Sequence, residues 1–233
     1  MMSVSDRTRE IEAPLVDEWY EWPTPVDWPF YLRLLRQRGD SGVPRMVYLD
    51  GSLLLMTPSL PHEERKERLN RLVHEVAVGC GIPYRPTAST TWKRRSRRGG
   101  VEGDHTYYLA NEPTIRGKRE VDLRADPPPD LAVEVVYSHD VTRAIEVYRR
   151  LGVPEVWVAT ERRFQILAPD RPGRGRRYRE VGRSVGFPFL SAEEIADRVY
   201  RDAPDGELRW AIELRDWVRE TLVPRLDAGG RAP

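Results

Sequence analysis

Residues 131–136 form a run, Leu-Ala-Val-Glu-Val-Val, that follows three prolines and an aspartate at 127–130. A short apolar run bounded by turn-forming residues predicts a β-strand that is buried on both faces. The run contains one acid, Glu134. Because an ionised carboxylate in such a strand is costly unless it is paired, hydrogen-bonded or bound to a metal, Glu134 is the first candidate for a functional residue. The alternative is a structural acid that is paired with an arginine such as Arg85 or Arg124.

The size and composition of the chain predict one folded domain. The chain has 233 residues, of which 39% are hydrophobic and 32% are charged, a balance typical of a globular protein. No apolar run approaches the roughly 20 residues that cross a bilayer, and residues 1–14 lack the apolar segment of a signal peptide. Cys80 is the one cysteine, which excludes an intrachain disulfide and a cysteine-rich zinc site. We therefore expect a cytoplasmic protein that does not associate with a membrane.

Two arginine-rich runs stand out from a net charge of only +1. The first run supplies five candidate DNA-binding residues, Lys93, Arg94, Arg95, Arg97 and Arg98. The second run lies between residues 171 and 183 and contains six arginines. Clusters of this kind suit contact with a phosphate backbone. The alternative is a pair of solvated loops, which the glycines beside both runs favour.

Apolar periodicity and turn-forming residues divide the chain into alternating helices and strands. The predicted helices cover residues 27–38, 63–80, 141–151, 191–198 and 208–226. The predicted strands cover residues 45–49, 52–56, 83–92, 105–109, 120–123, 131–136, 156–158 and 164–167. Asp50-Gly51 joins the first two strands as a type I′ hairpin turn. This order of elements predicts a mixed α/β domain.

We divide the chain into three parts. Residues 1–15 form a flexible N-terminus, residues 16–200 form the main domain, and residues 201–233 carry a C-terminal helix with a loose tail. Trp210 and Trp217 lie seven residues apart and extend the apolar face of that helix. Packing of this face on the domain is the simplest interpretation, and a dimer contact is the alternative.

A second acid, Asp104, directly precedes the strand predicted at residues 105–109. The 30 residues from Asp104 to Glu134 are enough for an excursion that returns the chain beside its own strand. Two carboxylates on neighbouring strands can share a hard cation such as Mg²⁺, which prefers oxygen ligands. Such an ion polarises a phosphoryl oxygen and lowers the pKa of a bound water. The pair therefore points to phosphodiester hydrolysis.

Three segments together resemble the Uma family of endonucleases, which belongs to the restriction-endonuclease-like, PD-(D/E)XK nuclease superfamily. They read Val-Glu-Gly-Asp-His-Thr-Tyr-Tyr at 101–108, Pro-Pro-Asp-Leu-Ala-Val-Glu-Val at 128–135, and Tyr-Arg-Arg-Leu-Gly-Val-Pro-Glu-Val-Trp at 148–157. Upstream pieces agree, among them Asp50-Gly51-Ser52 and Pro61-His62-Glu63. The resemblance spans roughly residues 25–170.

The resemblance implies an α/β fold with a restriction endonuclease-like mixed β-sheet core flanked by helices, an extra N-terminal hairpin and C-terminal helices. It implies that Asp104 and Glu134 are the catalytic acids that bind the metal, Mg²⁺ or Mn²⁺, and that the substrate is DNA. Glu63 on the helix at 63–80 is a candidate third catalytic residue. His62 is interpreted as a helix-start residue, and Asp130 as a turn cap. Restriction-type nucleases often cut as dimers, so the resemblance makes a homodimer an alternative to a monomer.

Three positions depart from the family pattern. Gly103 replaces a proline that usually precedes the metal-binding aspartate. Val136 occupies the position of the superfamily lysine, two residues after the second acid. Family members commonly supply a substitute lysine four residues before the helix tyrosine, and here that position is Ala144. Arginine is a poor replacement for a lysine that orients water, so the adjacent Arg143 does not restore the function. Lys118 is the remaining candidate for a catalytic cation.

Two functional hypotheses follow. In the first, the protein is a Mg²⁺-dependent endonuclease that hydrolyses DNA and is impaired by the missing lysine. In the second, it is a catalytically inactive DNA-binding or interaction module on the same fold, because a fold does not fix a function.

Overall fold

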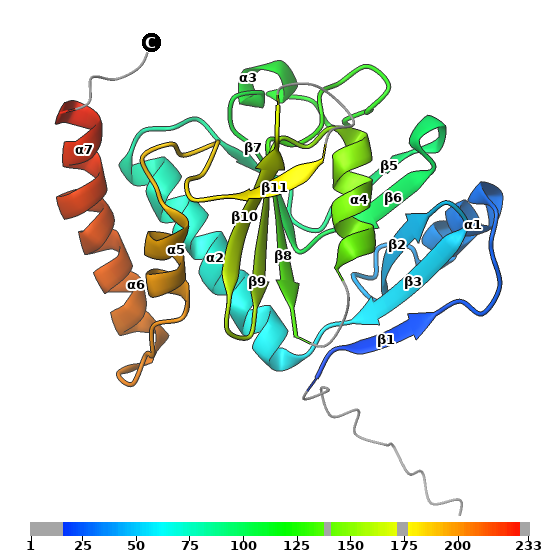
Figure 1. Cartoon of the computed structure of the whole chain (residues 1–233), viewed down its shortest axis with the longest axis horizontal. Helices are drawn as coiled ribbons and strands as arrows, with labels where there is room; N and C mark the ends of the chain where they lie inside the picture. Colours follow the sequence, from blue (N-terminus) through cyan, green and yellow to red (C-terminus); the bar gives the residue numbers. More distant parts are fainter. Residues whose placement is uncertain (1–15, 138–140, 172–176, 229–233) are drawn as a thin grey trace, which may run out of the picture.

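The part of the chain that the computed structural model describes, residues 16–137, 141–171 and 177–228, forms two β-sheets with helices on their faces (Figure 1). Helix α4 (Thr142–Leu151) packs between the sheets, where its apolar side meets strands of both. The predicted class is therefore confirmed: a mixed sheet flanked by helices, with an N-terminal hairpin and C-terminal helices. The predicted flexible N-terminus and the end of the predicted loose tail, residues 229–233, lie outside the described residues.

The larger sheet has six strands in the order β11-β10-β9-β8-β7-β4. Its strands are β4 (Arg85–Pro86), β7 (His105–Tyr108), β8 (Leu131–Val136), β9 (Val156–Thr160), β10 (Phe164–Pro169) and β11 (Tyr178–Val181). The β8–β9 pair is parallel, and the other pairs in this sheet are antiparallel. A parallel pair needs a crossover connection, and α4 supplies it. The predicted buried strand is confirmed as β8, which is buried at all six positions.

The smaller sheet has five antiparallel strands in the order β1-β3-β2-β6-β5. Its strands are β1 (Glu18–Glu21), β2 (Arg45–Leu49), β3 (Ser52–Thr57), β5 (Thr91–Arg94) and β6 (Gly99–Glu102). Asp50 and Gly51 join β2 to β3, both with positive φ, as a type I′ turn requires. Helix α1 (Trp28–Arg38) packs Tyr31 against Tyr48 of β2. The predicted hairpin is thus confirmed.

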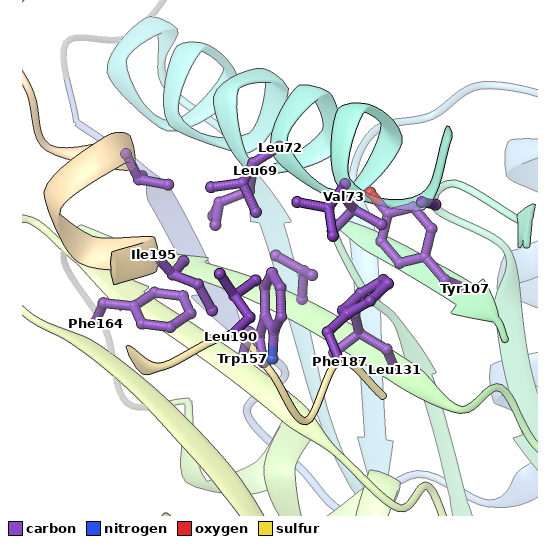
Figure 2. Packing of buried hydrophobic residues seen from close by; sticks show 14 of the residues in the cluster. Leu69, Leu72, Val73, Tyr107, Leu131, Trp157, Phe164, Phe187, Leu190 and Ile195 are labelled. Atoms are coloured by element: carbon purple, nitrogen blue, oxygen red, sulfur yellow. The ribbon is translucent and has the colours of Figure 1, made fainter. Parts of the chain in front are cut away.

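The main core lies between the larger sheet and a layer of helices (Figure 2). The helices are α2 (Leu60–Gly79), α5 (Ala192–Val199) and α6 (Gly206–Trp217). Helix α7 (Val223–Ala228) follows them, and none of its described side chains belongs to this core. Figure 2 shows Leu69, Leu72 and Val73 of α2 facing Trp157 of β9. A second apolar cluster surrounds α4 on the opposite face of β8, so β8 is covered on both sides. No helix within the described ranges is long and apolar enough to cross a membrane.

Several predicted boundaries were wrong. The strand predicted at 83–92 is broken into β4 and the start of β5, because Pro86 has no N–H for the ladder and a turn follows it. Residues 120–123 are not a strand, and the short helix α3 (Glu112–Ile115) was not predicted. Helix α2 begins at Leu60 rather than 63, because Ser59 is its N-cap.

The basic run at 93–98 is not a loop. Lys93 and Arg94 end β5, a 3₁₀ turn covers Arg95–Arg97, and the adjacent glycines belong to β6. Packing requires a glycine at position 100, because a Cβ there would overlap the Tyr31 hydroxyl. We call residues 93–98, which are the end of β5 and its connection to β6, the basic tip.

The C-terminal helix also differs in detail from the prediction. It begins at Gly206, and a π-helical segment, Val218–Leu222, connects α6 to α7. Trp210 is buried and Trp217 is partly buried against the main core. Leu208, which was expected on the apolar face, is 76% exposed.

Candidate active site

Asp104 directly precedes β7, and Glu134 lies on the neighbouring strand β8. The β7–β8 ladder ends at the pair of His105 and Val133, so Asp104 and Glu134 are the residues next to that end of the ladder. The Val135 backbone N–H donates to Asp104 Oδ2 at 2.6 Å, which ties the aspartate to β8. Both acids are buried, with exposed fractions of 1% for Asp104 and 7% for Glu134. The two acids that the sequence singled out therefore lie in one buried place.

Glu134 is a buried carboxyl group whose charge is weakly compensated. The Tyr148 hydroxyl on α4 donates to Glu134 Oε1 at 2.6 Å. Burial raises the pKa of Glu134 to about 7, although the Tyr148 hydrogen bond and the Arg45 charge oppose this effect. The arginines considered as structural partners lie elsewhere: Arg85 donates to the carbonyls of residues 115 and 118, and Arg124 pairs with an aspartate at 122.

Gly103 makes room for the hydroxyl that orients Glu134. A Cβ at this position would overlap Tyr148 Oη and would lie 3.0 Å from Glu134 Oε1. The departure from the family's proline therefore has a steric consequence, because a larger residue here would displace Tyr148. Glycine leaves Asp104 in place beside Val135.

Arg45 is a site residue that sequence reasoning missed. Its Nη1 forms an ion pair with Asp104 Oδ1, and its Nη2 bonds to Glu63 Oε1 at 2.7 Å. Only 6% of its side chain is exposed. Arg45 begins β2 in the smaller sheet, so its side chain links the two sheets. The same signal that marked Glu134, a charged residue in a buried strand, was present in the sequence Arg-Met-Val-Tyr-Leu at 45–49.

His62 holds Asp104 from the side opposite Val135. It is fully buried, and its Nε2 lies 2.7 Å from Asp104 Oδ1 while its Nδ1 lies 3.0 Å from Asp17 Oδ2. Burial opposes ionisation of Asp17, but hydrogen bonds from His62 and Ser59 lower the pKa of Asp17 to about 2. His62 does lie in the first turn of α2, as interpreted, yet its ring also positions an acid of the site.

The other two catalytic candidates, Glu63 and Lys118, lie in different parts of the structure. Glu63 is at the edge of the site, with 38% of its side chain exposed, and it pairs with Arg45 and Lys66. Burial acts to raise the pKa of Glu63, but the Lys66 hydrogen bond and the Arg45 charge outweigh burial. The pKa of Glu63 therefore lies below its usual value. Lys118 lies after α3, and its ammonium group pairs with Asp126.

The structure also places Asp130, Arg143 and Ala144. Asp130 accepts hydrogen bonds from the N–H groups of Leu109 and Asn111 at 2.7 and 2.9 Å, so it caps the turn after β7 as predicted. Arg143 pairs with Glu21 at 2.9 Å. Ala144 lines a small pocket that Arg45 and Glu134 also line, so the position of the family's substitute lysine does face the site.

The donor set fits a hard divalent cation. Mg²⁺ commonly binds through one or two carboxylates and completes its shell with water and substrate phosphate. Within the described ranges no group of three or more His, Cys, Asp or Glu side chains is placed to hold a metal. A nearby cation would favour the ionised form of Glu134, which burial disfavours.

The basic tip lies on the same hairpin as the site but at its far end. The register pairs Thr91 with Glu102 near the acids and Arg94 with Gly99 at the tip. Three residues of strand, or about 10 Å, therefore separate the tip from Glu102. Arg98 pairs with Asp50 at 3.2 Å. Of the second basic run, residues 172–176 lie outside the described residues.

A family model described as "Putative restriction endonuclease", Uma2, matches residues 28–200, well over half of the chain. The chain is a member of the Uma2 family. The matched range includes Arg45, His62, Asp104 and Glu134. Asp17 and the helices α6 and α7 lie outside it. The resemblance inferred from the sequence segments is thereby confirmed.

A solved structure is similar to this Uma2 protein. It is the crystal structure of a "putative nuclease belonging to DUF820" from Anabaena variabilis, with a TM-score of 0.51 and 13% sequence identity. The match covers 75% of this chain and 99% of that chain. At this identity the likeness shows a shared fold. None of the curated proteins matches the chain.

Proposed function

We propose that this Uma2 protein is a divalent-metal-dependent endonuclease that hydrolyses phosphodiester bonds in DNA. The observation that carries the proposal is the burial of two neighbouring acids, Asp104 just before β7 and Glu134 on the adjacent strand β8. This pair would hold Mg²⁺ or Mn²⁺, which when bound polarises a phosphoryl oxygen and lowers the pKa of a bound water. Family membership and a nuclease-like fold support the same reaction class.

The residues around the pair have distinct proposed roles. His62 and the Val135 N–H fix the Asp104 carboxylate, and the Tyr148 hydroxyl fixes Glu134. Glu63 is exposed enough to meet substrate or solvent, and we retain it as a catalytic candidate. Lys118 also remains a proposed catalytic cation, which would have to leave Asp126 to act. Loss of cleavage with unchanged DNA binding in Lys118→Ala would support that role.

The basic tip is the proposed contact to the DNA backbone. Its cations are Lys93, Arg94, Arg95, Arg97 and Arg98. Contacts of this kind position a duplex without reading its sequence. The tip lies about 10 Å along the hairpin from Glu102, so backbone contact and cleavage would occur at neighbouring phosphates of one duplex.

A second function is a catalytically inactive DNA-binding or interaction module. The observation that favours it is the Arg45 guanidinium on Asp104, together with the absence of a lysine at positions 136 and 144. In this case the buried acids and Arg45 would serve the fold and the basic tip would retain DNA binding.

A plasmid-nicking assay separates the two functions. Wild-type protein should nick supercoiled DNA with Mg²⁺ or Mn²⁺ and not with a chelator, and Glu134→Ala should abolish nicking. Glu75→Gln is a matched control, because Glu75 is buried on α2 but is paired with Arg215. A protein that shifts duplex DNA with a steep salt dependence and never cuts it would favour the inactive module.

We further propose a cytoplasmic location and consider a homodimer. Leu208 and Ile212 are exposed one turn apart on α6 and would be the centre of such a contact. Light scattering on the purified protein measures the assembly state directly, and a monomer at working concentration would remove the dimer proposal.

A further inference from the structure

The site balances its acids with an internal cation. The carboxylates of Asp17, Glu63, Asp104 and Glu134 gather around two basic side chains, Arg45 and His62. Buried carboxylates are costly unless they are paired, and Arg45 is the guanidinium that acts on three of the four. Arg45 therefore already supplies part of the positive charge that a divalent ion would bring to these carboxylates.

Arg45 is also attached in a way that lets it release one partner and keep another. Its Nη1 is on Asp104, deep in the site, while its Nη2 is on Glu63, which is partly exposed. If Nη1 leaves Asp104, the bond to Glu63 still compensates the guanidinium. Asp104 in turn keeps His62 at 2.7 Å and the Val135 N–H at 2.6 Å, so the aspartate stays in place.

We propose that Arg45 is a built-in counter-cation that a divalent ion must displace from Asp104, so that Arg45 sets the metal affinity of the site. This inference rests on the proposed metal-binding role of Asp104 and Glu134. An ion bound to Asp104 would lie beside the Arg45 guanidinium. Two neighbouring positive charges repel strongly in a buried site. Metal binding and the Arg45–Asp104 ion pair therefore exclude each other.

The test is Mn²⁺ binding, measured by electron paramagnetic resonance or calorimetry without DNA. Arg45→Met keeps much of the apolar stem and removes the charge, and the Kd for Mn²⁺ should fall at least tenfold, equivalent to about 1.4 kcal/mol. Arg215→Met is the matched control, because Arg215 also pairs with a glutamate on α2, Glu75, away from the acids. Its Kd should equal that of the wild type.

The outcomes separate this inference from the proposed function. If the wild type binds Mn²⁺ in a Glu134-dependent manner and Arg45→Met binds it equally well, the counter-cation role is overturned and the metal site stands. If neither protein binds Mn²⁺, the metal site itself fails. Tighter binding in Arg45→Met alone supports the inference.

A second measurement avoids dependence on the folding of Arg45→Met. In wild-type protein labelled with ¹⁵N-arginine, the Nε–H resonance that disappears in the conservative Arg45→Lys variant reports on Arg45. Addition of Mg²⁺ should shift this resonance while that of Arg215 stays fixed. An unchanged Arg45 resonance at saturating Mg²⁺ would overturn the displacement.

Discussion

Replacement of Glu134 by glutamine should stabilise the protein, and the gain should depend on pH. The amide keeps an oxygen that accepts the Tyr148 hydrogen bond, observed at 2.6 Å, but it carries no charge. Burial raises the pKa of Glu134 in the folded protein from 4.5 to about 7. The folded state therefore holds this proton more tightly than the unfolded state does.

The sign and the size of the effect follow from this difference. Between pH 4.5 and about 7 the folded state binds more protons at Glu134, so the contribution of Glu134 to stability is lost as the pH rises through this window. Each pKa unit corresponds to about 1.36 kcal/mol, which gives about 3 kcal/mol at pH 8. Glu134→Gln lacks this loss, and for a chain of this size the melting temperature at pH 8 should rise by about 6–12 °C.

Urea unfolding at pH 4.5 and pH 8, with a chelator present, measures the effect. The two proteins should have similar free energies of unfolding at pH 4.5 and should differ by about 3 kcal/mol at pH 8. Glu102→Gln is the control, and it should lower the free energy of unfolding at pH 8. The reason is that the Glu102 carboxylate accepts hydrogen bonds from Arg38, Thr91 and the Met46 N–H. A difference between wild type and Glu134→Gln that stays constant across this pH range would refute the conclusion that Glu134 is weakly compensated.

Two further predictions concern sterics and DNA binding. Gly103→Ala would place a methyl group on the Tyr148 hydroxyl and should cost about 1–3 kcal/mol in urea unfolding, whereas Gly42→Ala, with open space around it, should change stability by less than about 0.5 kcal/mol. Equal values for the two variants would contradict the steric role of Gly103. Replacement of the cations of the basic tip by alanine should weaken DNA binding and lower the salt slope by about 0.9 for each phosphate that the variant no longer neutralises; an unchanged slope would show that DNA binds elsewhere.

Local patterns in the sequence determined much of the fold. The buried strand β8, the β2–β3 hairpin and the helices α1, α4 and α5 each carry their own apolar periodicity, turn residues or caps. The motif segments also identified the family and singled out Asp104 and Glu134. These features are readable because they depend on residues close together in the chain.

Only the tertiary structure decided how the acids are compensated. Arg45, His62 and Tyr148 come from β2, α2 and α4, and Asp17 precedes β1. No local pattern states which of these groups will meet. The assignment of β5 and β6 to a second sheet was equally hidden, because strand pairing depends on partners distant in sequence. Burial then sets the energies: the pKa of Glu134 follows from its enclosure between β8 and α4. The sequence supplies the charged groups, and the packing of two sheets against α2 and α4 decides which charges balance and which remain available to a cation.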